Sequence, residues 1–130
     1  MVTRQSELLR VLGSLAEEIP DPAWVALVDY NGLIVACVPP EPDVELERIS
    51  AMTAAAVMMG ERVLGEIDGG QLRFASIAGA KRQQLTMALS KDRLLSIGLG
   101  PEVPAQATIG PVSRWVPELM KALKMRFTRD

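Results

Sequence analysis

Few residues in this chain of 130 have the chemistry of a catalytic site. The sequence contains no histidine, which excludes Ser-His and Cys-His nucleophile pairs and histidine metal sites. It also removes the commonest general base near pH 7. The single cysteine, Cys37, cannot form an internal disulfide. It lies in the apolar run 33–38, where a thiol packs as a small hydrophobic group and lacks the cationic, exposed setting of a reactive one.

The acidic and glycine-rich motifs are also poor candidates for catalysis. Asp29 and Asp68 lie beside glycine-containing turns, and neither has the second carboxylate that glycoside hydrolysis requires. The segment Gly98-Leu99-Gly100-Pro101 lacks the Gly-Lys-Ser/Thr ending of a phosphate-binding loop, so we interpret it as a strand end and a turn. The sequence therefore predicts a protein that is not an enzyme and holds no cofactor or metal ion.

The overall composition points away from nucleic acids and membranes. The net charge is −2 and aromatic residues make up 4%, whereas nucleic-acid binding favours a basic stripe or stacking aromatics. No apolar stretch reaches the ~20 residues that span a bilayer, and the N-terminus lacks the apolar core of a signal peptide. We expect one cytoplasmic domain over residues 1–130, with no nucleic-acid partner and no membrane insertion.

The first third of the chain predicts a helix followed by a hairpin. Apolar residues at helical spacing indicate a helix over 4–18, with Thr3 as its N-cap. Two β-rich runs follow, at 24–28 and 33–38, and Asp29-Tyr30-Asn31-Gly32 joins them. The Asn-Gly pair predicts a type I′ turn, because both residues tolerate positive φ. The second run is almost continuously apolar, which indicates a central strand covered on both faces.

The segment from Ile49 to Gly60 is the most informative, because its only polar side chains are Ser50 and Thr53. We expect it to belong to a helix over 43–63. At about 100° per residue, one side of this helix should face a sheet: Leu46, Ile49, Met52, Ala56, Val57 and Val63. The opposite side is also apolar, with arginines toward its ends: Arg48, Ala51, Ala54, Ala55, Met58, Met59 and Arg62.

A soluble monomer rarely leaves such an apolar face in water, so we interpret it as the contact surface of a homodimer. Small alanines let two helix backbones approach closely, and methionine adapts to irregular partners. The alternative is that another part of the chain covers this face.

Three alternating patterns predict an antiparallel meander, with strands at 71–77, 84–89 and 94–99. We expect the first of these strands at a sheet edge. Arg73 is the only charge within 71–77, so this edge, with Arg73 and Ala75, is expected to pair with a second copy or to remain in water.

A last helix is predicted over residues 109–126, and Pro117 allows two forms of it. The helix either begins at Thr108 and is kinked at Pro117, or begins after Ser113 with Pro117 in its first turn. The element order is then helix, two strands, helix, three strands, helix. This order predicts a three-layer α/β fold, with a five-stranded antiparallel sheet between the central helix and the two terminal helices.

This pattern resembles the roadblock / dynein light chain domain family. The resemblance covers about residues 5–125 and rests on the hairpin at 26–36 with its Asp-x-x-Gly turn, the Ala/Met-rich run 52–60 and the meander at 71–99. These are patterns of residue type without an invariant catalytic signature. The prolines at 39, 40 and 42 and the two in the last helix depart from the family's pattern.

The resemblance implies a homodimer in which the central helices pair and the third strands join into one sheet. It also implies binding and regulation of a small Ras-like GTPase, as a GTPase-activating or effector-type partner that inserts no arginine into the nucleotide site. One alternative is a dimeric scaffold for protein assembly without any effect on nucleotide turnover. Another is a small-molecule sensor, which is disfavoured because the sheet carries few polar groups that converge on an apolar pocket.

Overall fold

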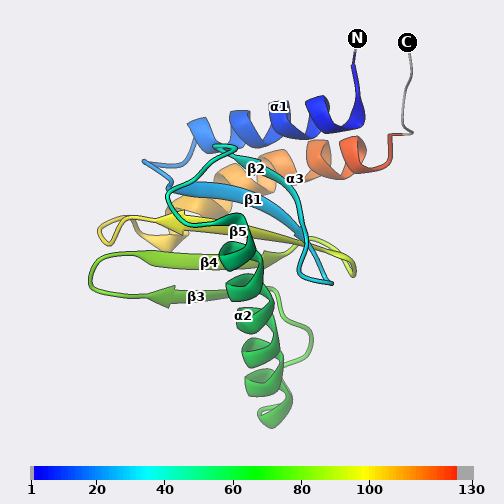
Figure 1. Cartoon of the computed structure of the whole chain (residues 1–130). Helices are drawn as coiled ribbons and strands as arrows, with labels where there is room; N and C mark the ends of the chain where they lie inside the picture. The colour runs from blue at the N-terminus through cyan, green and yellow to red at the C-terminus, as the bar shows by residue number, and fades with distance from the viewer. Residues whose placement is uncertain (1, 126–130) are drawn as a thin grey trace.

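The computed structural model describes residues 2–125, which form one five-stranded sheet with helices on both faces. In chain order the elements are α1 (Arg4–Glu17), β1 (Trp24–Asp29), β2 (Ile34–Val38), α2 (Leu46–Glu66), β3 (Phe74–Ala78), β4 (Gln83–Ala88), β5 (Arg93–Leu99), the short 3-10 helix η1 (Ala105–Thr108) and α3 (Ile109–Leu123). The strand order is β2-β1-β5-β4-β3, and every neighbouring pair is antiparallel. Helix α2 lies on one face, and α1 with α3 on the other (Figure 1). The predicted three-layer fold is confirmed.

The position of β2 corrects one prediction. The apolar run 33–38 predicts a central strand, but β2 lies at a sheet edge, and β1 is its only neighbour among the described strands. It is nevertheless covered on both faces, because Ala36 joins the core beside α1 and α3 while Cys37 joins the core beside α2. An unbroken apolar run therefore indicates that both faces are covered, and it does not indicate how many strands flank it.

The turn between β1 and β2 differs from the predicted type I′ form. Gly32 has a φ of +79°, but Asn31 lacks the positive φ that such a turn requires. Instead, the Asp29 carboxylate accepts hydrogen bonds from the backbone N–H groups of Asn31 and Leu33, at 2.9 and 3.1 Å. The aspartate side chain shapes this turn because it binds nearby backbone donors, and glycine supplies the left-handed position.

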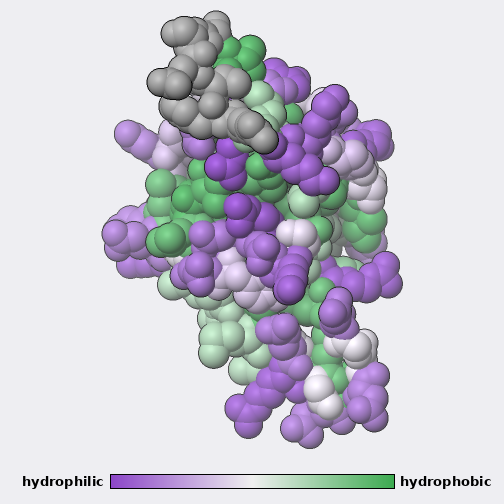
Figure 2. All heavy atoms as spheres, turned by 90° about the vertical axis from the view of Figure 1, so that its right-hand side faces the viewer, coloured by the Kyte–Doolittle hydropathy of each residue, from purple (hydrophilic) through white to green (hydrophobic). Residues whose placement is uncertain are grey.

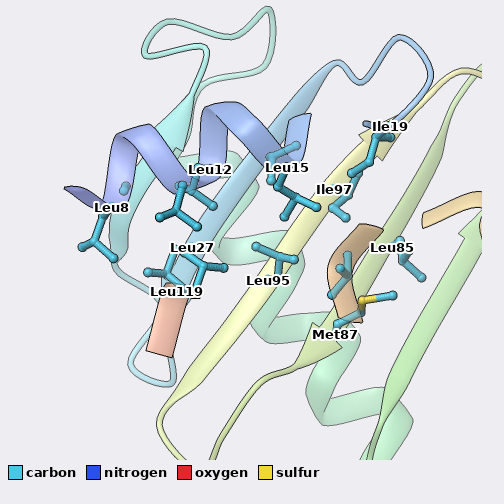
Figure 3. Packing of buried hydrophobic residues seen from close by; sticks show 14 of the residues in the cluster. Leu8, Leu12, Leu15, Ile19, Leu27, Leu85, Met87, Leu95, Ile97 and Leu119 are labelled. Atoms are coloured by element: carbon cyan, nitrogen blue, oxygen red, sulfur yellow. The ribbon is translucent and has the colours of Figure 1, made fainter. Parts of the chain in front are cut away.

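Helix α1 begins as predicted, with Thr3 as its N-cap. The Thr3 hydroxyl accepts a hydrogen bond from the Ser6 N–H, and the Ser6 hydroxyl accepts one from the Thr3 N–H, both at 3.0 Å. This capping box satisfies backbone donors at the start of the helix. Figure 3 shows the core between α1 and the sheet, which contains leucines from both: Leu8, Leu12, Leu15, Leu27 and Leu95.

Helix α3 begins at Ile109 and contains Pro117 in its interior, so the form that begins after Ser113 is wrong. The predicted helix end at residue 126 lies outside the described residues. Helix α3 packs beside α1, where the Glu18 carboxylate accepts hydrogen bonds from the side chains of Arg114 and Trp115. These two donors hold the pKa of the Glu18 carboxyl below its usual value.

Trp24 packs on the opposite face of the sheet, under the start of α2, and contacts several segments there. Its ring lies against Gly98, where an added Cβ would be 2.5 Å away, and its indole N–H donates to the Ser96 hydroxyl at 3.1 Å. The Arg82 guanidinium lies 5.8 Å from the ring centroid and pairs with Asp43 at 2.7 Å. These contacts tie the segment that leads into α2 to the turn between β3 and β4.

Candidate interaction surface

The residues of α2 that face the sheet are nearly the same as the predicted ones. All but one of the predicted residues are buried or half-buried: Leu46, Ile49, Met52, Ala56 and Val57. The prediction for Val63 is wrong, because this side chain is 51% exposed. The C-terminal part of α2 projects past β3 and beyond the sheet, so no strand lies beneath it (Figure 1).

Ser50 and Thr53 are also buried on the sheet side of α2, and sequence reasoning missed them. Their hydroxyls donate to backbone carbonyls one turn earlier in the helix, those of Glu47 at 2.9 Å and Ile49 at 2.7 Å. A hydroxyl that is satisfied within its own helix can be buried at little cost. The two sides of α2 were assigned from hydrophobicity alone, which could not predict that Ser50 and Thr53 are buried.

The opposite side of α2 points away from the sheet, and we call five of its residues the outer α2 face: Ala51, Ala54, Ala55, Met58 and Met59. Ala51 and Ala55 are exposed and Ala54 is half-buried, while Met58 and Met59 are 71% and 63% exposed. Arg48 and Arg62, near the two ends of the helix, are exposed as well.

The exposed apolar surface extends beyond the outer α2 face. Val63 and Ile67 continue it toward the C-terminal end of the helix, and Ile67 is 67% exposed. Figure 2 shows hydrophobic residues among hydrophilic ones in the lower part of the molecule, into which α2 projects. Burying apolar area is favourable by roughly 25 cal/mol per Å². A surface of this kind therefore favours contact with another protein.

Strand β3 lies at a sheet edge, as predicted, and pairs only with β4 among the described strands. It begins at Phe74, so Arg73 precedes the strand and is exposed. Ala75 is half-buried against the core beneath α2. Phe74 and Ile77 are 50% and 60% exposed, and the edge thus combines unpaired backbone groups with apolar side chains.

Helix α2 and the β3 edge adjoin one another. Leu72, just before β3, packs against Gly60, where an added Cβ would lie 2.9 Å from the Leu72 Cδ1 atom. Because Gly60 has no side chain, α2 approaches this segment closely. Gly60 directly follows Met58 and Met59 in the sequence, so this part of α2 lies near the segment that leads into β3, whereas Arg48 lies near the N-terminal end of the helix.

The residues weighed for catalysis have structural roles. Cys37 is buried, and burial raises the pKa of its thiol to about 11, so the thiol is uncharged at neutral pH. Asp29 shapes the first turn, and Asp68 lies in the turn after α2 with a φ of +51°. Within residues 2–125, no group of three or more His, Cys, Asp or Glu side chains is placed to hold a metal ion.

The chain belongs to the Roadblock/LC7 domain family, whose model matches residues 11–98. Its fold is that of the Roadblock/LC7 domain from Streptomyces avermitilis, with a TM-score of 0.78 at 16% identity over 89% of this chain and 97% of that one. Myxococcus xanthus MglB gives a TM-score of 0.72 at 15% identity over 93% and 94% of the two chains. The gliding protein MglB from Thermus thermophilus gives 0.78 at 12% identity over 94% and 92%.

None of the curated proteins matches the sequence. In the described part of the chain, no helix is both long enough and apolar enough to cross a membrane.

Proposed function

We propose that this chain is a single-domain, homodimeric roadblock module that binds and regulates a small Ras-like GTPase. One observation carries the proposal: a member of this family exposes an apolar helix face directly beside a strand edge. The exposed surface supports self-association. Family membership supports the class of partner.

A second copy of the chain is the occupant that fits the outer α2 face. Within residues 2–125, Ala51, Ala55 and both methionines of this face are exposed, which supports a second copy over the alternative of an intramolecular core. A two-fold contact would set the alanines and methionines of two helices against each other, and the β3 edges would pair their free backbone groups. The proposed interface has nine residues: Arg48, Ala51, Ala54, Ala55, Met58, Met59, Arg62, Arg73 and Ala75.

A regulator acts through binding and needs no nucleophile or general base of its own. This agrees with a sequence that has no histidine and with a thiol that is buried and uncharged. The proposed role is therefore to bind the GTPase and alter its nucleotide cycle, and the chemistry of hydrolysis belongs to the GTPase.

The test is single-turnover GTP hydrolysis by the Ras-like GTPases of the same genome, with and without this protein, alongside a titration that measures binding. We expect binding of at least one GTPase and a changed rate of hydrolysis. Absence of both binding and rate change for every such GTPase would refute the proposal. Binding with an unchanged rate would favour the alternative, a dimeric scaffold.

A further inference from the structure

A pocket lies beside α2, where the chain turns at the ends of β1, β4 and β5, and we call it the strand-end pocket. Its volume is about 610 Å³, within the ~300–1,000 Å³ of small-molecule sites. Four separate parts of the chain line it: Tyr30 after β1, Glu61 of α2, Gln71 and Leu72 before β3, and Ala88, Leu89, Ser90 and Lys91 at the end of β4 and in the turn that follows.

Backbone hydrogen bonds fix two of these parts against their neighbours. The Tyr30 N–H donates to the Asp92 carbonyl at 3.2 Å, which holds the end of β1 beside the start of β5. The Ala88 N–H donates to the Arg73 carbonyl at 3.0 Å, which holds the segment before β3 beside the end of β4. The pocket is therefore formed by the sheet pairing and is present in the single chain.

The strand-end pocket combines an apolar interior with a polar rim. Leu72 is buried, and Ala88 and Leu89 are half-buried. In contrast, Glu61 and Lys91 are exposed. Small-molecule sites have this distribution, in which apolar side chains supply contact area and a few polar groups orient the ligand.

The two charged side chains of the pocket have opposite signs and are available to a ligand. The ion pairs within residues 2–125 involve neither Glu61 nor Lys91. The Glu61 carboxylate accepts a hydrogen bond from the Tyr30 hydroxyl, and burial together with the charge of Glu61 raises the pKa of Tyr30 above its usual value. The tyrosine is therefore an uncharged donor that orients the carboxylate, which keeps further acceptor positions.

Lys91 has a second donor beside it. The Ser90 hydroxyl accepts a hydrogen bond from the Asp92 N–H at 3.3 Å, and its own hydrogen can still be donated. The turn between β4 and β5 thus presents an ammonium group and a hydroxyl group, which together suit a carboxylate.

We propose that the strand-end pocket binds a small zwitterion with an aliphatic side chain, which is the chemistry of a free amino acid or a dipeptide. Glu61 would pair with the ammonium group of the ligand, and Ser90 and Lys91 would bind its carboxylate. The aliphatic side chain would leave water against Leu72 and Leu89.

The polar groups of this site come from α2 and from turns, although the sheet itself carries few. None of the residues that line the pocket belongs to the nine-residue dimer interface proposed above. The inference therefore goes beyond the proposed function and does not depend on it.

Three leucine compounds test this proposal by nuclear magnetic resonance titration of the isotope-labelled full chain. Leucine carries both charges, N-acetylleucine lacks the ammonium group and leucinamide lacks the carboxylate. From the shifts of backbone amides around the pocket, we expect leucine to bind ~10-fold or more tightly than either analogue. Leucyl-leucine separates the two sources of the chemistry: tighter binding than leucine indicates a dipeptide, and weaker binding indicates a free amino acid.

Two variants assign each charge to its side chain. Glu61→Gln should weaken leucine binding ~10-fold and make leucine and N-acetylleucine bind equally. Lys91→Gln should make leucine and leucinamide bind equally. Glu66→Gln and Lys81→Gln are the matched controls, because both residues are exposed and lie outside the pocket. The controls should bind leucine as the unmodified chain does.

Absence of amide shifts around the pocket at about 10 mM leucine and leucyl-leucine would overturn the proposal. Binding of either analogue as tightly as leucine would also overturn it, as would an unchanged affinity for leucine in Glu61→Gln. The amide spectrum of each variant reports whether it is folded, so that a failure to fold is not mistaken for lost binding. The comparison of the three leucine compounds on the unmodified chain needs no variant.

Discussion

Single residues decide how closely the elements of this protein approach one another. Gly98 lies directly against the Trp24 ring, which Arg82 covers and a hydrogen bond to Ser96 holds in place. Gly60 has the same role between α2 and Leu72. In both cases the glycine permits a close contact with a side chain from a distant part of the sequence. Helix and strand propensities describe single residues, so they cannot predict such a contact.

Gly98→Ala should destabilise the fold by about 1–3 kcal/mol, because the new methyl group would overlap a ring that has little room to move. Urea unfolding followed by tryptophan fluorescence measures this change. Gly13→Ala is the control: Gly13 lies inside α1 with nothing within 4 Å of an added Cβ, so stability should rise by about 0.5–1 kcal/mol. A Gly98→Ala protein as stable as the original would contradict the tight packing of Trp24.

At the scale of elements, α2 has an apolar surface on two sides and covers the sheet with only one of them. Its sheet side contains small hydroxyl residues that bond within the helix, and its outer face contains alanines and methionines. The two sides have similar hydrophobicity but different surroundings. The outer α2 face is exposed, and α2 lies beside β3. We therefore place the dimer contact on the outer α2 face and the β3 edge.

Ala55→Glu should shift the protein from dimer to monomer, because it would bury a charge between the two paired helices. Light scattering measures the change in mass. Ala80→Glu is the matched control, since Ala80 is exposed in the turn between β3 and β4, away from the outer α2 face.

Arg73→Glu should reduce dimer formation less than Ala55→Glu, because Arg73 is exposed just before β3. An unchanged dimer mass for Ala55→Glu would exclude this interface, and complete loss of the dimer in Arg73→Glu would show that the β3 edge contributes more than α2.

At the scale of the whole molecule, folding and assembly should be coupled. Much of the apolar surface of α2 would leave water only in the dimer, so part of the stabilising burial depends on protein concentration. The thermal midpoint of the unmodified chain should therefore rise by a few degrees for each tenfold increase in concentration. Differential scanning calorimetry over a concentration series measures this, and the midpoint of Ala55→Glu should stay constant. A constant midpoint for the unmodified chain would contradict the coupling.

The elements, the three-layer fold and the two sides of α2 could largely be predicted from the sequence. Thr3 predicted the start of α1, and the alternating runs after residue 70 predicted the meander. The candidate interface could be predicted only in part. Ala75 lies in the edge strand β3 as expected, but Arg73 precedes the strand. Val63 and Ile67 are exposed because α2 extends past the sheet beneath it.

What the sequence determined by itself is local: where helices and strands lie, and which side of each helix is apolar. Those properties follow from the spacing of residues within one segment. The tertiary structure alone decided that β2 is an edge strand, that α2 extends past β3, and that a pocket forms where α2 meets the ends of β1, β4 and β5. These features depend on pairings between distant residues, such as Val25 with Ile97, and on how far a helix extends across five strands. The apolar face of α2 was therefore visible in the sequence, but its place beside a free strand edge was not.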